Sequence, residues 1–112
     1  MVEGVIDFSE WEKVDLRVGE IEKVEEVKGA DKLYKLTIGL GKEVRTICAG
    51  LKQYYSKEDL TGKRCVVFVN LKPRVMKGIE SQGMILAAVN EEENKVILIV
   101  PEEEIEIGSK IR

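Results

Sequence analysis

Side chains that could contact a phosphate polymer gather in one stretch of the sequence, NLKPRVMKGIESQGM, at residues 70–84. Its basic members are Lys72, Arg74 and Lys77. Lysine and arginine neutralise phosphates, and the hydroxyl and amide groups of Ser81 and Gln82 can hydrogen-bond a sugar or the edge of a base. The alternative is that these side chains form an ordinary solvated surface.

Further basic and aromatic side chains lie earlier in the chain and could extend such a surface. Lys32 and Tyr34 open an expected strand, and Lys52 shortly precedes Tyr54 and Tyr55. A tyrosine ring offers a flat face to an unstacked base, an interaction of roughly 1–3 kcal/mol. Half-buried packing explains a tyrosine equally well, and solubility explains a lysine.

The charge of the chain is unevenly distributed. The 112 residues carry a net charge of −3, yet residues 42–77 contain 9 basic and 3 acidic side chains, whereas residues 78–112 contain 3 basic and 8 acidic ones. A local basic patch can bind a polyanion even when the whole chain is acidic. This segment by itself leaves chance clustering open. Apolar stretches are at most six residues long, so we expect no membrane partner.

The sequence lacks the residue sets of a catalytic or metal site. It has no histidine, the commonest general base and metal ligand. The GLG stretch at residues 39–41 lacks the context of a phosphate-binding loop, and the glutamate runs 91–93 and 102–104 are better explained as solvated turns than as a cation site. We therefore expect no enzyme activity, no cofactor and no metal. Cys48 and Cys65 form no CxxC motif and are expected to be small buried hydrophobic residues.

The first half of the chain is expected to hold a short helix and three strands. Ser9 and Glu12 fit a capping box, which predicts a helical turn with Ser9 as N-cap. Apolar residues alternate over residues 15–27 with an interruption at Gly19, which predicts a long bent strand with a bulge at that glycine. Alternating segments joined by a tight turn predict a hairpin within residues 35–49.

The second half is expected to hold a helical turn, further strands and a terminal apolar set. Residues 56–62 have the capping serine and the final glycine of a helical turn. Strands are expected at residues 64–71, 84–89 and 96–100. The basic segment between the first two of these strands is expected to be a surface loop. The terminal apolar set consists of Ile105, Ile107 and Ile111.

Together these elements predict an all-β fold. The expected architecture is a five-stranded OB-fold (Greek-key) barrel with a short N-terminal helix, a mid-chain helical turn and extra C-terminal strands. An SH3-like barrel competes with it on pattern alone. Because the chain shows no repeat and no linker, we expect a single domain over residues 1–112.

Several stretches, in a fixed order, resemble a known family. They are VDLRVGEIEKVEEV, GADKLYKLTIGLG, RTICAGLKQYY, LTGKRCVVFVNLKPR and GIESQGMILAA. They resemble the tRNA-binding OB-fold domain appended to methionyl-tRNA synthetases, which is similar to stand-alone dimeric tRNA-binding proteins. The resemblance covers residues 9–111, and the NLKPR and GIESQGM motifs are its most specific parts.

The resemblance implies a non-catalytic, cytoplasmic domain that binds tRNA by shape, forms a homodimer and assists a methionyl-tRNA synthetase, whose catalytic part would be a further partner. Together with the residues described above, it gives the expected tRNA-binding set: Lys32, Tyr34, Lys52, Asn70, Lys72, Arg74, Lys77, Ser81, Gln82 and Met84. The chain departs from the family pattern at residues 27–29, where relatives often read His-Pro-x, and at Val75, where they often have another basic residue.

A dimeric peptide-binding chaperone or interaction module of the same fold is the alternative. A secretion chaperone of this fold shares the RVG opening found here at residues 17–19. Its block after the fourth strand is typically less basic and lacks the GIESQGM motif, which this chain has at residues 78–84. We therefore favour tRNA binding. The terminal isoleucines suit either a dimer interface or the chain's own core.

Overall fold

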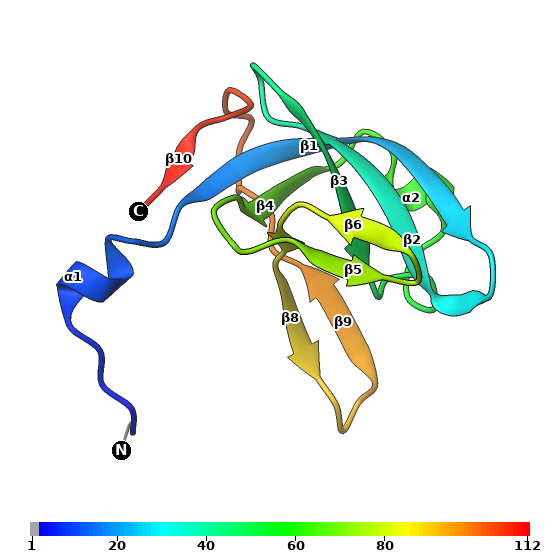
Figure 1. Cartoon of the computed structure of the whole chain (residues 1–112), viewed down its shortest axis with the longest axis horizontal. Coiled ribbons are helices and arrows are strands. Elements are labelled where there is room, and N and C mark those ends of the chain that lie inside the picture. The colour runs from blue at the N-terminus through cyan, green and yellow to red at the C-terminus, as the bar shows by residue number, and fades with distance from the viewer. Residues whose placement is uncertain (1–2) are drawn as a thin grey trace.

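The computed structural model describes residues 3–112, which form two short helices and ten strands (Figure 1). In chain order these are α1 (Phe8–Trp11), β1 (Leu16–Val27), β2 (Ala30–Gly39), β3 (Val44–Ala49), α2 (Lys57–Leu60), β4 (Arg64–Phe68), β5 (Arg74–Met76), β6 (Ile79–Ser81), β7 (Met84–Ile85), β8 (Ala87–Asn90), β9 (Lys95–Leu98) and β10 (Lys110–Ile111). The predicted all-β fold is confirmed. Neither helix within residues 3–112 is long and apolar enough to cross a membrane.

The main sheet is built around β1, the longest strand. Its strands follow the order β3-β2-β1-β4-β7, and β10 pairs with the start of β1. β1 changes partner along its length: residues 16–20 pair with β4, and residues 20–27 pair with β2. Figure 1 shows β1 curving across the molecule between these two partners. This single strand therefore links the β2–β3 hairpin to β4, from which the basic segment continues.

Gly19 has a packing role in β1, and the bulge predicted at this residue is wrong. Gly19 pairs regularly with Cys65, and the register shifts occur further along the strand. A Cβ atom at Gly19 would lie 2.7 Å from Cγ2 of Ile38, well inside the optimal separation of carbon atoms. A glycine is required because the side chain of Ile38 fills the space that a Cβ atom would need.

The apolar core combines residues of the main sheet with Leu51, Leu60 of α2 and Leu98 of β9. Ile21, Leu36 and Leu60 are among its fully buried members. Cys65 is also fully buried and unpaired, as the sequence predicts. Burial raises the pKa of the Cys65 thiol to about 12, so the residue stays protonated and packs as a small hydrophobic side chain.

The two helical turns begin differently. α2 has the predicted N-cap, since Oγ of Ser56 accepts a hydrogen bond of 3.1 Å from the backbone N–H of Asp59. The N-cap predicted at Ser9 is wrong. The helix α1 begins at Phe8, with Asp7 as its N-cap in extended conformation, so Ser9 lies inside the helix. Aspartate and serine are N-caps of similar preference, so residue type alone did not decide between two candidates this close together.

The basic segment after β4 lies largely on the surface, as predicted, but it forms a hairpin and the loop expected there is wrong. β4 ends at Phe68, and β5 and β6 pair with each other in a separate two-stranded sheet. Lys77 and Gly78 form the turn between them, with φ angles of 52° and 81°, which matches the left-handed backbone of a type I′ turn. Strands of only three residues are too short to show a clear alternation, which is why the sequence pattern did not indicate them.

The strand predicted over residues 84–89 is interrupted at Leu86, where the chain changes partner. β7 pairs with β4, whereas β8 pairs with β9. The N–H of Leu86 donates to the carbonyl of Val66 (3.0 Å), and its carbonyl accepts from the N–H of Ile99 (3.2 Å). The β8–β9 hairpin turns away from the main sheet after this point and projects from the molecule in Figure 1.

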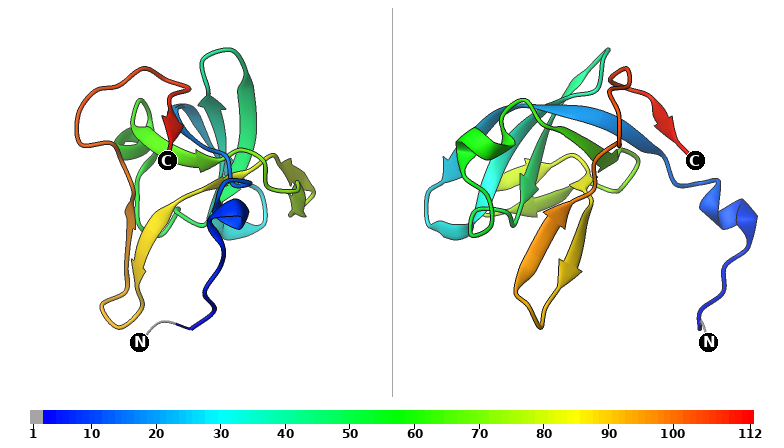
Figure 2. Two further views of the ribbon diagram at one scale, coloured as in Figure 1. Left: turned by 90° about the vertical axis from the view of Figure 1, so that its left-hand side faces the viewer. Right: turned by 180° about the vertical axis from the view of Figure 1, so that it is seen from behind.

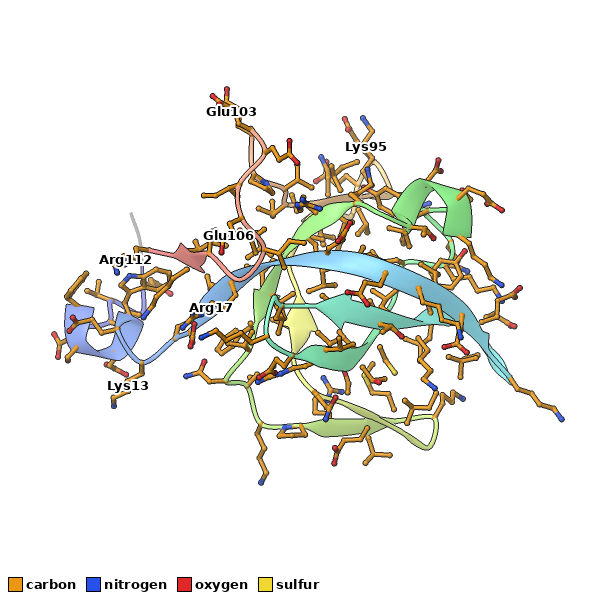
Figure 3. All side chains as sticks on the ribbon, turned by 90° about the horizontal axis from the view of Figure 1, so that it is seen from above. Lys13, Arg17, Lys95, Glu103, Glu106 and Arg112 are labelled. Carbon is orange, nitrogen blue, oxygen red and sulfur yellow. The ribbon has the colours of Figure 1, made fainter. Side chains whose placement is uncertain are left out.

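The acidic C-terminal segment and the basic segment lie on opposite sides of the molecule. Figure 2 (left) and Figure 3 both place the chain around Glu103 and Glu106 on the side away from the β5–β6 hairpin. Of the terminal isoleucines, Ile107 and Ile111 are half-buried, whereas Ile105 is 46% exposed. The terminal set therefore belongs partly to the chain's own packing and partly to its surface.

Candidate nucleic-acid interface

The β5–β6 hairpin, with the residues that lead into it, carries the predicted basic side chains. We call residues 72–81 the basic hairpin. Lys72, Arg74 and Lys77 are all exposed, and Lys77 lies at the tip of the turn. Among the ion pairs formed within residues 3–112, none involves these three residues or Glu80, the hairpin's acidic residue. Three cations without an ion-pair partner among the described residues, against one glutamate on the same hairpin, leave a net positive local potential that attracts phosphate.

An apolar hollow of about 320 Å³ lies beside the basic hairpin. Its walls come from the end of β3, from the hairpin and from β7 to β9, and they include the side chains of Leu71, Met76 and Met84. Lys72 and Arg74 contribute to the same walls, and Met84 is 45% exposed. Small-ligand sites combine apolar walls with a few polar groups in this way. The hollow therefore combines apolar walls with two basic side chains at its border.

Ser81 and Gln82, both predicted to touch a ligand, are hydrogen-bonded to the protein itself. Ser81 is 3% exposed; its Oγ accepts from the N–H of Cys48 (2.9 Å) and donates to the carbonyl of Gly83 (3.1 Å). Gln82 is exposed, but its Oε1 accepts from the N–H of Thr46 (3.0 Å). Both side chains thus bind backbone groups at the edge of β3.

Asn70 is engaged in the same manner. Its Oδ1 accepts from the N–H of Asp15 (2.8 Å), and its Nδ2 donates to the carbonyl of Lys13 (2.5 Å). The side-chain amide therefore binds two backbone groups of the segment that leads into β1. Like Ser81, it holds the chain at one end of the basic hairpin.

The remaining predicted residues have different surroundings. Tyr34 is 5% exposed and its hydroxyl donates to the carbonyl of Tyr55 (2.8 Å), so its ring lies in the core and is not presented for stacking. Nζ of Lys52 lies 2.6 Å from Oε1 of Glu26; their hydrogen bond lowers the pKa of Glu26 and raises that of Lys52. Lys32 is exposed. Of this group, Lys32 is the residue whose charge stays available to a ligand.

Arg45 of β3 lies next to the basic hairpin, although nothing in the sequence marks it. Its Nη1 donates to the carbonyls of Val69 and Gln82, the latter at 3.2 Å, and its Nε donates to Oε1 of Glu43. The side chain is 25% exposed. Its partners come from both ends of the basic hairpin, so sequence reasoning about neighbouring residues could not identify its role.

The cysteines and carboxylates of residues 3–112 form neither a metal-binding cluster nor an activated thiol. Within residues 3–112, no three His, Cys, Asp or Glu side chains are placed to hold a metal ion. Burial raises the pKa of both Cys48 and Cys65, which disfavours the thiolate that a nucleophilic cysteine needs.

Comparison with known proteins identifies the family. Residues 16–110 match the model of the family described as putative tRNA binding domain. The chain belongs to this family. The matched residues contain the basic hairpin and the walls of the hollow, so the candidate interface is part of the tRNA-binding domain itself.

The relatives of this tRNA-binding domain include much longer enzymes. Methionine–tRNA ligase of Pyrococcus furiosus is 46% identical over 107 residues, which make up 96% of this chain and 14% of the ligase. Methionine–tRNA ligase of Methanocaldococcus jannaschii is 49% identical over 107 residues, or 96% of this chain and 16% of the ligase. The chain thus spans about one-seventh of the length of such relatives.

Solved structures confirm the OB-like fold of the domain. The crystal structure of a MetRS-related protein from Pyrococcus horikoshii superimposes with a TM-score of 0.90 at 38% identity, covering 97% of this chain and 99% of that one. The chaperone CsaA of Bacillus anthracis superimposes with a TM-score of 0.87 at 29% identity, covering 97% of this chain and 100% of that one. One fold therefore serves proteins with different names, and the residues of the site must decide the function.

Proposed function

We propose that this chain is a non-catalytic module that binds tRNA without sequence specificity and assists a methionyl-tRNA synthetase in the cytoplasm. The observation that carries the proposal is the basic hairpin, which presents three exposed cations, unpaired within residues 3–112, beside an apolar hollow in a domain of the tRNA-binding family. Because the chain spans 14% of a methionine–tRNA ligase, catalysis would lie in another part of such an enzyme, which is then a partner of this module.

Lys72, Arg74 and Lys77 would contact the phosphate backbone, and Lys32 would extend this contact. Such contacts fix the position of a nucleic acid but carry no sequence information, which accounts for the proposed lack of sequence specificity. The glutamate-rich segment at residues 102–106 lies on the opposite side of the molecule (Figure 3). Attraction for tRNA would therefore be confined to the face that carries the basic hairpin.

The hollow would receive an unstacked tRNA base. Met84 and Met76 line it, and methionine adapts to apolar groups of different shape. Lys72 and Arg74 border the same space, so a phosphate attached to the inserted nucleotide would meet a positive charge. This arrangement suits exposed loop bases, which RNA-binding proteins commonly recognise in unstacked form.

Titration with bulk tRNA at several salt concentrations tests the proposal. Each neutralised phosphate contributes a slope of about −0.7 to −0.9 to the dependence of log K on log salt, so the three contacts of the hairpin predict about −2 to −3, to which Lys32 would add about −1. Joint replacement of Lys72, Arg74 and Lys77 by alanine should remove most of this slope. Lys95→Ala is the matched control, because Lys95 pairs with Glu93 at 3.3 Å and lies far from the hairpin in Figure 3. A flat salt response of the unmodified chain would exclude the proposal.

We also propose that the chain forms a homodimer through its N-terminal arm. Val5, Ile6 and Phe8 are 86%, 58% and 70% exposed, and α1 stands clear of the main sheet in Figures 1 and 2. A second copy of the chain would bury these apolar side chains. Light scattering should give the mass of a dimer, and Ile6→Asp with Phe8→Asp should give that of a monomer. Val44→Asp, at a residue 57% exposed on β3, should leave the mass unchanged.

Binding of an apolar peptide in the same hollow is a second candidate function. It is favoured by the likeness to the chaperone CsaA, at 29% identity and a TM-score of 0.87, and by the two methionines that line the hollow. A labelled peptide rich in leucine and phenylalanine would then bind with little dependence on salt. Peptide binding without tRNA binding would replace the first proposal by this one.

A further inference from the structure

The basic hairpin has little support from neighbouring strands. β5 and β6 pair with each other and with no strand of the main sheet, and an isolated two-stranded hairpin is marginally stable in water. A hairpin that must be ordered when tRNA binds loses part of the binding free energy to that ordering. The contacts at its two ends therefore decide how well its charges are positioned.

At the first end, the chain leaves β4 and is tied to the segment before β1. The N–H of Val69 donates to the carbonyl of Asp15 (2.9 Å). The side chain of Asn70 then binds the N–H of Asp15 and the carbonyl of Lys13, at 2.8 and 2.5 Å. Three hydrogen bonds thus hold Val69 and Asn70, which lie shortly before the first basic residue, Lys72.

At the second end, the chain is tied to the free edge of β3. The N–H of Gln82 donates to the carbonyl of Thr46 (2.8 Å), while its side-chain Oε1 accepts from the N–H of the same residue (3.0 Å). Oγ of Ser81 accepts from the N–H of Cys48 (2.9 Å). The side chains of Gln82 and Ser81 therefore accept hydrogen bonds from N–H groups of β3 that would otherwise pair with a further strand.

Arg45 joins these two ends. One nitrogen of its guanidinium, Nη1, donates to the carbonyl of Val69 at the first end and to that of Gln82 at the second. Its Nε donates to Glu43, which also compensates its charge. Three of the five N–H groups of an arginine are thus used within the protein, and the side chain is 25% exposed.

We propose that Arg45 is a positioning residue of the tRNA interface and not a phosphate contact. With Asn70, Ser81 and Gln82 it forms an end clamp that holds the basic hairpin in one orientation before tRNA arrives. The consequence for affinity rests on the proposed tRNA-binding function, whereas the clamp itself rests on the contacts above. Its pairing with Glu43 distinguishes Arg45 from the basic residues of the hairpin, which have no acidic partner in the described part of the chain.

Trypsin tests the clamp in the absence of tRNA, because the peptide bonds after Arg74 and Lys77 lie within the basic hairpin. We expect Arg45→Ala and Arg45→Lys to be cleaved at these bonds severalfold faster than the unmodified chain. Both variants should bind tRNA about tenfold more weakly, with the salt slope unchanged. Lysine keeps the charge of Arg45 but lacks a fixed planar set of donors, so it should not restore binding.

Substitutions of Arg74 provide the matched control. For a direct phosphate contact, Arg74→Ala should reduce the magnitude of the salt slope by about one, Arg74→Lys should retain most of the affinity, and neither should alter cleavage after Lys77. If Arg45 variants behave like these Arg74 variants, Arg45 is a phosphate contact and the proposal is wrong. Faster cleavage with unchanged tRNA affinity would equally exclude a positioning role.

Two further measurements keep the outcomes separate. Cleavage after Lys95, remote from the clamp, should stay at the rate of the unmodified chain, which excludes general unfolding as the cause. Gln82→Ala removes one bond of the clamp and replaces Arg45→Ala if that variant does not fold; it should show the same two effects at smaller size. Failure of the unmodified chain to bind tRNA would refute the proposed function, whereas unchanged cleavage in folded variants would refute the clamp.

Discussion

Replacement of Ser81 by alanine distinguishes a structural role from a binding role for this residue. Its Oγ accepts from the N–H of Cys48 at 2.9 Å and donates to the carbonyl of Gly83 at 3.1 Å, and the residue is 3% exposed. The substitution leaves both backbone groups without this partner in a place that water hardly reaches. Each unsatisfied buried group costs about 1–3 kcal/mol, so the loss of two partners in Ser81→Ala should lower the free energy of unfolding by about 2–6 kcal/mol.

Urea unfolding followed by circular dichroism measures this change. The midpoint should fall while the slope m stays the same, because the surface exposed on unfolding does not change. Ser9→Ala is the matched control, since Ser9 is exposed in α1, and its effect should stay within about 0.5 kcal/mol. If Ser81→Ala leaves stability unchanged and weakens tRNA binding, Ser81 is a ligand contact and the structural reasoning is refuted.

Three further predictions concern stability and can be checked by thermal or urea unfolding. Gly19→Ala should cost about 1–3 kcal/mol, because its Cβ would overlap the side chain of Ile38. Leu60→Ala should cost about 2–5 kcal/mol, because Leu60 is fully buried and anchors α2 to the core. The hydrogen bond from Arg17 lowers the pKa of Asp15 below its ordinary value of 3.8, so this carboxylate stabilises the fold above that value and the stabilisation is lost as the pH falls through the lowered pKa. Asp15→Asn should therefore reduce the melting temperature at neutral pH and have no effect in strong acid.

Local patterns in the sequence were sufficient for the parts of the fold with regular alternation. The structure confirms the hairpin of β2 and β3 and the N-cap at Ser56. Both could be predicted because they depend on residues close together in the sequence. The same alternation argues that Tyr34 is buried and does not stack on a base. Tyr34 lies two positions before Leu36 and four before Ile38, so its side chain is on the same face of β2 as theirs. All three are buried.

The parts that depend on distant residues could not be predicted in this way. Asn70 binds a residue 55 positions away, Ser81 one that is 33 positions away and Gln82 one that is 36 positions away. A short polar side chain looks the same in the sequence whether it binds a ligand or a backbone group of a remote segment. The motif therefore indicates where the interface lies without showing which of its residues face solvent.

Loss of tRNA affinity in an alanine scan would not separate a residue that positions the hairpin from one that contacts phosphate. Arg45 and Arg74 are both basic and lie at the same site, and removing either should weaken binding. The difference is that Glu43 compensates the charge of Arg45, whereas a phosphate contact by Arg74 would release a counterion. Because the salt slope counts phosphates and not the order of the hairpin, affinity lost at constant slope indicates positioning, and affinity lost with a smaller slope indicates contact. Salt dependence, more than affinity, therefore assigns the residues of this interface.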